Sequence, residues 1–107
     1  MKRGDIVTVA LPRAYGKPRP AVIIQANFFD QHPSVTILPV TSDLSDTPLF
    51  RVTVRSTPDN GLQKTSQVMV DKTHTVPRDK IGKVLGQLDD ASMLSVSRAL
   101  ALFLGFA

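Results

Sequence analysis

The stretch Arg19-Pro20-Ala21-Val22-Ile23-Ile24 decides the expected fold of this chain. Its last four residues are apolar on both faces, which is typical of a strand at the centre of a sheet, and we expect that strand to cover residues 21–25. Residues 12–20 contain a glycine and three prolines, and residues 27–34 are largely polar with one proline. A loop therefore flanks the strand on each side, and this arrangement indicates a small β-rich domain.

Short runs rich in β-branched residues recur on both sides of this central strand. Residues 50–55 alternate apolar with polar or basic side chains, which predicts a half-exposed strand with a basic outer face. Pro39 lacks an N–H group, so we expect it at an edge or a bulge. The remaining strands are expected within residues 5–11, 35–40, 66–76 and, interrupted by two glycines, 81–88.

The last segment predicts a helix. Asp89 and Asp90 offer capping oxygens and first-turn charges that suit the helix dipole, and Gly105 is placed to end the helix. Residues 99–107 are apolar and are expected to form a core-facing helix end. The residues at helical spacing are Met93, Val96, Leu100, Phe103 and Leu104. The predicted fold class is mainly β with a C-terminal α-helix, arranged as a small β-barrel or curled sheet.

Composition places the chain among small basic globular proteins. Its 107 residues suit one domain, 1–107, and 13 Lys and Arg against nine Asp give a net charge of +4. It contains no cysteine, which excludes disulfides and thiolate metal sites and fits a cytoplasmic location. The N-terminus has no secretory pattern, and no apolar run approaches the ~20 residues that span a bilayer.

One loop concentrates positive charge. Arg13, Lys17 and Arg19 lie within seven residues that contain Tyr15 and no acid. Basic side chains beside an aromatic ring favour binding to a polyanion such as RNA. A solvated basic loop explains the composition equally well.

The sequence carries no recognisable metal or nucleotide motif. His32 and His74 are the only histidines, and neither stands at the spacing of a zinc site. The six glycines form no phosphate-binding loop. These patterns favour chemistry without metal or cofactor, or plain binding, although a spatial Ser-His-Asp triad stays open.

Arg19 is the leading candidate for chemistry. Pro18 and Pro20 stiffen its backbone, which suits a guanidinium aimed at a phosphate. Thr41 and Ser42 place two hydroxyls at the end of the predicted 35–40 strand, where turn formation is the alternative role. Asp71 is a candidate base or an ion-pair partner of Lys72. His74 is a candidate proton carrier or an ordinary surface residue.

Three phrases in their order, followed by the helix, resemble the MazF/PemK (Kid-like) toxins of type II toxin–antitoxin systems. They are Arg3-Gly4-Asp5-Ile6-Val7, Arg19-Pro20-Ala21-Val22-Ile23-Ile24 and Pro39-Val40-Thr41-Ser42. The resemblance implies a small SH3-like β-barrel (the CcdB/MazF-like toxin fold), usually a cytoplasmic homodimer. It implies a metal-independent endoribonuclease that cleaves single-stranded mRNA at specific sequences. It also implies neutralisation by an acidic antitoxin, with operator DNA bound only through that antitoxin.

The resemblance implies roles for particular residues. Arg19, Thr41 and Asp71 match catalytic positions, and RNA binding is expected at Arg13, Tyr15, Lys17, Ser42 and His74. The chain departs from the family in three places. The loop before Arg19 is short and has neither Glu nor His, and Met69 stands where some members have a basic residue. His74-Thr75 stands where the family has Arg-Thr. The general base and the cut sequence are therefore not fixed by the resemblance.

Two other functions fit parts of the sequence. A CcdB-like toxin that inhibits DNA gyrase shares the fold and needs no clamp at Arg19. A non-catalytic SH3-like module could bind RNA or protein through the basic strand face at Arg51 and Arg55. Phe28 and Phe29 are expected in the core, with stacking on RNA bases as the alternative. Arg19 with the Thr41–Ser42 pair favours the nuclease.

Overall fold

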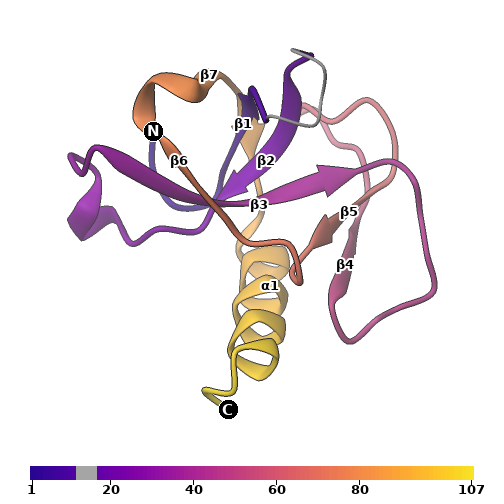
Figure 1. The fold of residues 1–107 in the computed structure, drawn as a ribbon. Coiled ribbons are helices and arrows are strands. Elements are labelled where there is room, and N and C mark those ends of the chain that lie inside the picture. The colour runs from indigo at the N-terminus through magenta and orange to yellow at the C-terminus, as the bar shows by residue number, and fades with distance from the viewer. Residues whose placement is uncertain (12–16) are drawn as a thin grey trace.

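A computed structural model describes residues 1–11 and 17–107 as a curled antiparallel sheet with one helix beside it (Figure 1). Short 3-10 turns η2 (Asn27–Phe29) and η3 (Arg78–Lys80) interrupt the loops, and helix α1 (Asp90–Phe103) follows the last strand. In the described residues the strands are β1 (Asp5–Val9), β2 (Arg19–Ile23), β3 (Ser34–Thr41), β4 (Arg51–Val54), β5 (Ser66–Met69), β6 (His74–Pro77) and β7 (Ile81–Gln87).

The sheet runs in the order β4-β5-β3-β2-β1-β7, and β6 pairs with β3 beside β5. The mainly β fold with a C-terminal helix is confirmed. The sheet is barrel-like in its curl, but within the described residues its outer strands β4 and β7 do not pair with each other, so it stays open. The long strand β3 is central, because it pairs with β2 along one side and with both β6 and β5 along the other.

Pro39 occupies a break in the pairing of β3. The pairs with β6 end at Ile37, and the pairs with β5 begin at Val40. The ring nitrogen therefore lies where a missing N–H costs no ladder hydrogen bond, as its sequence predicted. The same break explains why residues 66–76 form two short strands where one was expected.

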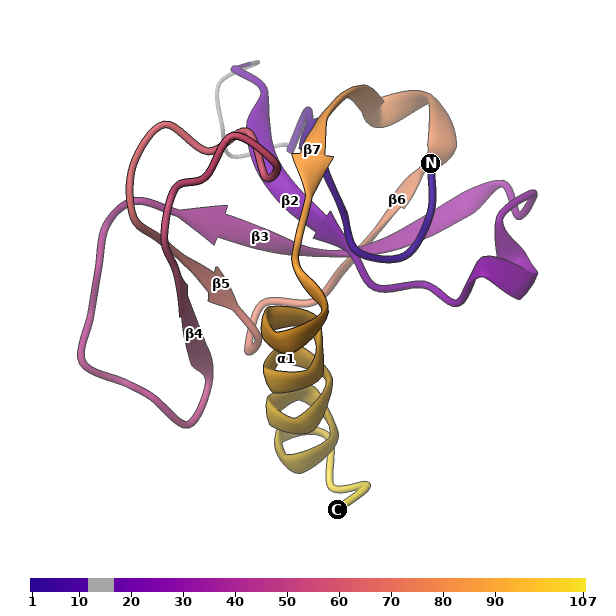
Figure 2. The same ribbon diagram turned by 180° about the vertical axis from the view of Figure 1, so that it is seen from behind.

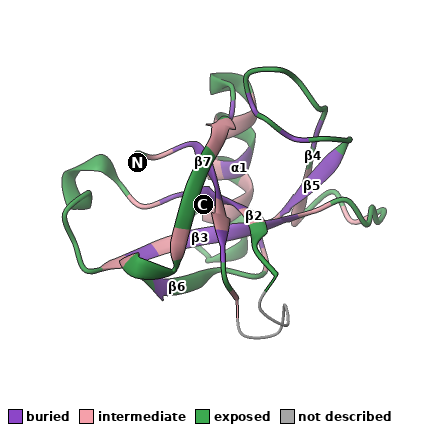
Figure 3. Cartoon of the chain, turned by 90° about the horizontal axis from the view of Figure 1, so that it is seen from above, coloured by how far each residue is buried: buried purple, intermediate pink, exposed green. Residues whose placement is uncertain are grey.

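Two apolar clusters fill the two faces of the sheet. On the helix side, Val22, Leu38 and Val96 belong to a buried cluster. On the other side, Ala21 and Ile23 belong to a second cluster with Val7, Val9, Val35, Ile37 and Val76. The central strand β2 thus buries alternate side chains on both faces, as its unbroken apolar pattern predicted. Figure 3 shows β3 and β5 largely buried and β7 mostly exposed.

Helix α1 begins where the sequence predicts. Asp89 is its N-cap, and its carboxylate accepts a hydrogen bond of 3.0 Å from the Ser92 N–H. Hydrogen bonds from Ser92, first from its side chain and then from its backbone N–H, lower the pKa of Asp89 below its ordinary value of 3.8. Arg3 ties the helix to the sheet, because its guanidinium donates to Ser97 Oγ at 2.6 Å and to the Ile24 carbonyl.

The prediction of a core-facing helix end holds for Ala99 and Leu100, which pack against the helix-side cluster, and is wrong from Leu102 onward. Leu102, Phe103, Leu104 and Phe106 are each between 47% and 81% exposed. A helix of 14 residues is about 21 Å long, and its second half runs past the sheet, with the C-terminus at its far end (Figure 2). The apolar side chains from Leu102 onward are therefore exposed to solvent.

Phe28 and Phe29 are also not in the core. Phe28 is 88% exposed and Phe29 is 52% exposed, and their rings meet edge to face at 5.1 Å. They lie in the turn η2 between β2 and β3, beyond the end of the sheet. Gln25 and Arg78 bond carbonyl groups of this turn, so its backbone is held while its aromatic side chains point outward.

Candidate active site

A groove of about 640 Å³ lies where β2 begins and β3 ends. Residues from β1, β2, β3 and β5 contribute to its walls, together with residues 61–64 between β4 and β5. The lining includes the Pro18-Arg19-Pro20 and Pro39-Val40-Thr41-Ser42 segments. Two of the phrases singled out in the sequence therefore meet in one concavity.

Arg19 opens β2 at the rim of this groove. Its backbone pairs with Val9 of β1, and Pro20 pairs with Thr8. The side chain is exposed, and it makes no hydrogen bond or ion pair with a residue that the structure describes. The prolines on either side fix the backbone of Arg19, while its five N–H donors face solvent and the groove.

The sheet brings Arg19 and Thr41 together. β2 and β3 are antiparallel, with Ala21 paired to Pro39. The pairing of the two strands ends at Ala21 and Pro39, and Arg19 and Thr41 each stand two residues beyond that last pair. Both residues line the groove. A guanidinium and a hydroxyl therefore share one site although 22 positions separate them in the chain.

The Thr41 hydroxyl is oriented by the turn that follows it. Its Oγ1 atom accepts a hydrogen bond of 3.0 Å from the Asp43 N–H. Because the oxygen is the acceptor in this bond, its own O–H remains able to donate to a phosphate oxygen. The next residue, Ser42, is exposed in the groove lining and adds a second hydroxyl. The predicted turn role and the predicted site role of Thr41 are thus compatible.

Gln67 supports this turn, although no local sequence pattern marks it as part of the site. It is the cross-strand partner of Thr41 and is 6% exposed. Its amide exchanges two hydrogen bonds with the Ser45 backbone, at 2.9 and 3.0 Å, and it also bonds Thr53 at 3.2 Å. Arg51 donates to the Asp43 carbonyl at 3.0 Å. The segment after Thr41 is therefore held by buried groups of β4 and β5.

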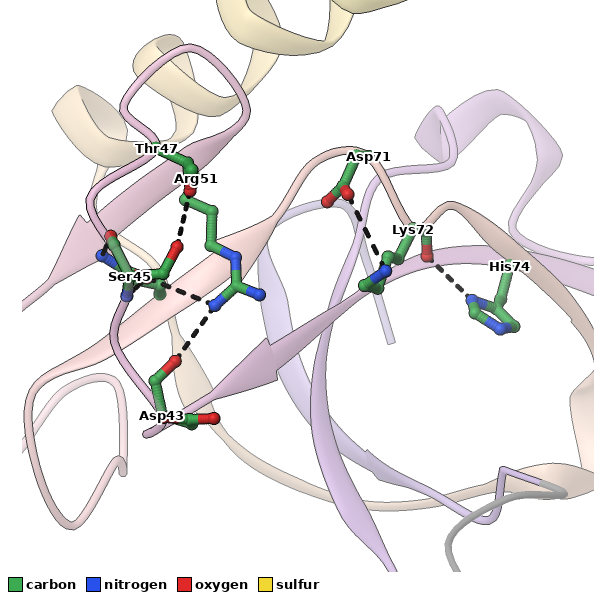
Figure 4. A network of polar contacts seen from close by, with 8 residues as sticks. Asp43, Ser45, Thr47, Arg51, Asp71, Lys72 and His74 are labelled. Atoms are coloured by element: carbon green, nitrogen blue, oxygen red, sulfur yellow. Dashed lines mark hydrogen bonds and ion pairs between the residues drawn. The ribbon is translucent and has the colours of Figure 1, made fainter.

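Asp71 and His74 lie outside the groove lining, in the turn after β5 and at the start of β6 (Figure 4). Asp71 Oδ2 lies 3.8 Å from the Lys72 ammonium, and Asp71 Oδ1 is buried without a hydrogen-bond partner in the described residues. His74 is exposed, and its Nδ1 lies 2.8 Å from the Lys72 carbonyl. Asp71, Lys72 and His74 thus form a cluster of their own, and the groove does not bring Asp71 to Arg19.

The other predicted RNA-binding residues are placed as follows. Lys17 is exposed next to Pro18 but is not part of the lining. Arg13 and Tyr15 lie outside the described residues. The structure adds two groove residues that the sequence reasoning missed, Gln63 and Lys64. Neither residue belongs to the three phrases that carry the family resemblance.

Among the described residues, the groove lining is positively charged and carries no acid. Arg19 and Lys64 are the charged residues of this lining. Residues 1–11 and 17–107 contain no group of three or more histidine and aspartate side chains placed to hold a metal ion. A concavity whose described lining has these two cations and the hydroxyls of Thr41 and Ser42 suits the binding of a phosphodiester.

The model of one protein family, described as PemK-like, MazF-like toxin of type II toxin–antitoxin system, matches residues 2–104. The chain belongs to this family. Among curated proteins, it is 46% identical over 108 residues to the probable endoribonuclease MazF of Mycolicibacterium smegmatis. That match covers 100% of this chain and 99% of the relative.

Solved structures of PemK/MazF-family toxins share the fold. A mycobacterial endoribonuclease in complex with its cognate antitoxin has a TM-score of 0.82 at 26% identity, covering 100% of this chain and 97% of that one. The Mycobacterium tuberculosis toxin MazF-mt6 has a TM-score of 0.81 at 24% identity, covering 94% and 96%. A MazE–MazF structure from Deinococcus radiodurans has a TM-score of 0.79 at 21% identity, covering 98% and 95%. In the described part of this chain, no helix has the length and apolarity needed to cross a membrane.

Proposed function

We propose that residues 1–107 form one toxin domain that cuts single-stranded mRNA at specific sequences, without a metal ion. The observation that carries this proposal is the shared groove of Arg19 and Thr41. Membership of the PemK/MazF family supports it, as does the relative named a probable endoribonuclease. The groove is open and lined by β-strands, so it suits unpaired bases better than a deep A-form duplex groove.

The reaction needs no outside nucleophile. The 2′-OH of one nucleotide attacks the adjacent phosphorus, and its proton passes to a base. The bond from phosphorus to the 5′ oxygen breaks, and that oxygen takes up a proton. The products are a 2′,3′-cyclic phosphate and a 5′-OH end. Arg19 stabilises the charge that develops on the phosphorane and is placed to protonate the leaving oxygen. Thr41, with Ser42, orients a non-bridging phosphate oxygen.

The partners follow from the activity. A cell that makes such a toxin needs a neutralising protein, and an acidic antitoxin complements a chain of net charge +4. A structural neighbour is an endoribonuclease bound to its cognate antitoxin. We expect a homodimer that acts on mRNA in the cytoplasm and reaches operator DNA only through the antitoxin.

Two alternatives are less favoured. The basic face of β4 offers less to a binding module than its sequence indicated, because Arg51 is half-buried and donates to Asp43 and Gln67. Arg55 alone remains exposed there. A gyrase inhibitor of the CcdB type needs no guanidinium beside a hydroxyl, whereas this groove has both.

Incubation of the purified protein with a long single-stranded RNA in excess EDTA tests the proposal. We expect discrete fragments with cyclic-phosphate and 5′-OH ends. Arg19→Ala should slow cleavage by ~10²–10³, the loss typical for one electrostatic donor. It should leave the melting temperature unchanged, because the side chain is exposed. Arg98→Ala, an exposed arginine on α1, serves as the matched control. Intact RNA in this assay contradicts the proposal.

A further inference from the structure

One wall of the groove is built by residues 61–64. They belong to residues 57–65, the segment between β4 and β5 that we name the 57–65 loop. Asn60, only 3% exposed, holds it together. Its carboxamide oxygen accepts from the N–H groups of Thr57 and Leu62 at 3.1 and 3.0 Å, and its amide nitrogen donates to the Arg55 carbonyl at 2.8 Å. The loop is therefore a fixed part of the groove.

The loop also packs backbone to backbone against β7. Gly61 has a φ of +70°, and a Cβ there would overlap the carbonyl group of Leu85. A Cβ at Gly86 would overlap the backbone of Asp59 and Asn60. The Gln87 N–H donates to the Asp59 carbonyl at 2.8 Å. Two glycines that allow this close approach thus set how far the loop stands from the rest of the groove.

This fixed loop presents Lys64 to the groove. The Ser66 hydroxyl donates to the Lys64 carbonyl at 2.8 Å, which positions the backbone while the side chain stays exposed. No aspartate of the chain lies within ion-pair distance of its ammonium, since the ion pair found among the described residues joins Lys72 to Asp71. In the part of the lining that the structure describes, Lys64 and Arg19 are the two cations, and they come from different segments of the chain.

We propose that Lys64 forms a second phosphate subsite, which binds a phosphate of the RNA next to the one held by Arg19. This inference rests on the proposed function and names how the same groove takes its substrate. Single-stranded RNA carries one phosphate per nucleotide, so a strand in the groove brings a second charge to a second cation. Lysine is a point charge that accepts a phosphate in many orientations, which suits a group that binds without taking part in the reaction. Lys64 thus aligns the strand, and Arg19 performs the chemistry.

The salt dependence of binding tests this subsite. The probe is a fluorescent single-stranded RNA 12-mer of mixed sequence with 2′-O-methyl groups, which block the attacking hydroxyl. Each phosphate contact contributes ~0.7 to the slope of log affinity against log salt for a single strand. Lys64→Ala should therefore lower the slope by about 0.7. Gln63→Ala, which removes the neutral neighbour in the same lining, should leave it unchanged, and Lys64→Arg should restore it. An unchanged slope for Lys64→Ala, or no binding by the wild type, overturns the subsite.

Cleavage kinetics separate this inference from the proposed function. On a natural RNA, Lys64→Ala should raise KM and leave kcat at the wild-type value, and the rise should shrink as salt increases. If the wild type cuts RNA and Lys64→Ala has the same KM as the wild type, the subsite is overturned and the nuclease proposal stands. If the wild type binds the probe but cuts no RNA, the proposed nuclease activity is overturned. The salt slope of Lys64→Ala then decides whether Lys64 binds a phosphate.

Discussion

At the scale of single residues, Asp71 is the group whose surroundings most need an explanation. Its Oδ1 atom is buried without a partner in the described residues, and Lys72 lies 3.8 Å from Oδ2. A buried acceptor without a hydrogen bond costs about 1–3 kcal/mol. Because the groove lining does not include Asp71, its catalytic role stays a prediction, and this cost is a reason to test it.

Asp71→Asn and His74→Ala distinguish the two candidates for the proton acceptor. If Asp71 takes the 2′ proton, Asp71→Asn should lower kcat by ~10²–10⁴, the usual range for a general base. Its stability should match or exceed the wild type, because a half-buried charge is removed. His74→Ala alters an exposed side chain and should change kcat by only a few-fold. Single-turnover cleavage and thermal melts provide the measurements. A large loss for His74→Ala with normal Asp71→Asn would reverse the assignment.

Some site residues could be predicted from the sequence and others could not, for a physical reason. Arg19 and Thr41 were visible because prolines and a strand end mark them locally. Gln67 and Lys64 were not visible, because their roles depend on tertiary contacts. Gln67 pairs with Thr41 on the neighbouring strand. Lys64 lies on a loop that packs closely against β7. A polar side chain in a strand gives no local sign of the partner it will meet.

At the scale of elements, the cap of α1 is the clearest local device. The Asp89 carboxylate accepts from the Ser92 N–H. Hydrogen bonding to the Ser92 side chain, and then to this N–H, lowers the pKa of Asp89 below 3.8. A lowered folded-state pKa means that the cap stabilises the protein fully above the unfolded value. The stabilisation is lost as pH falls through the folded value, when the carboxyl group becomes protonated.

Asp89→Ala should therefore lower the free energy of unfolding by about 0.5–2 kcal/mol at pH 7. The difference from the wild type should shrink as pH falls below about 4, since the wild type then loses the same charge. Urea unfolding at pH 7 and at pH 3 measures both values. Asp89→Ser, which keeps a capping oxygen without the charge, should retain most of the stability. A pH-independent difference for Asp89→Ala would show that the charge contributes nothing.

Element types were predictable where the pattern was local and strong. The unbroken apolar run of β2 and the acidic cap of α1 both gave the right element. The burial of the last turn of α1 was predicted wrongly. Apolar residues at helical spacing show that a helix has an apolar face, but they do not show which element covers that face. The segment 66–76 misled for a related reason. Its division into β5 and β6 depends on the break opposite Pro39, which the segment itself does not contain.

At the scale of the whole molecule, charge is unevenly distributed. Within residues 1–11 and 17–107, the groove lining has two cations and no acid, whereas residues 99–107 have no ionisable side chain. Large apolar side chains crowd this uncharged end, where Leu102 is 55% exposed and Phe106 is 81% exposed. Two copies of net charge +4 repel each other across most of their surfaces. The electrostatic repulsion between two copies is smallest where the ends of their α1 helices meet, and burial of the apolar area there favours contact.

We therefore expect the homodimer to form through the end of α1. Light scattering after gel filtration should give the wild type twice the 11.6 kDa of one chain. The double change Leu102→Ser and Phe106→Ser should shift it to the single-chain mass. The secondary structure should remain, because both side chains are exposed and lie past the sheet. Leu49→Ser, at a side chain that is 71% exposed in the segment before β4, is the control and should stay dimeric. A double variant that stays dimeric would place the dimer contact on another face, and a wild type that is monomeric at every concentration would remove the dimer itself.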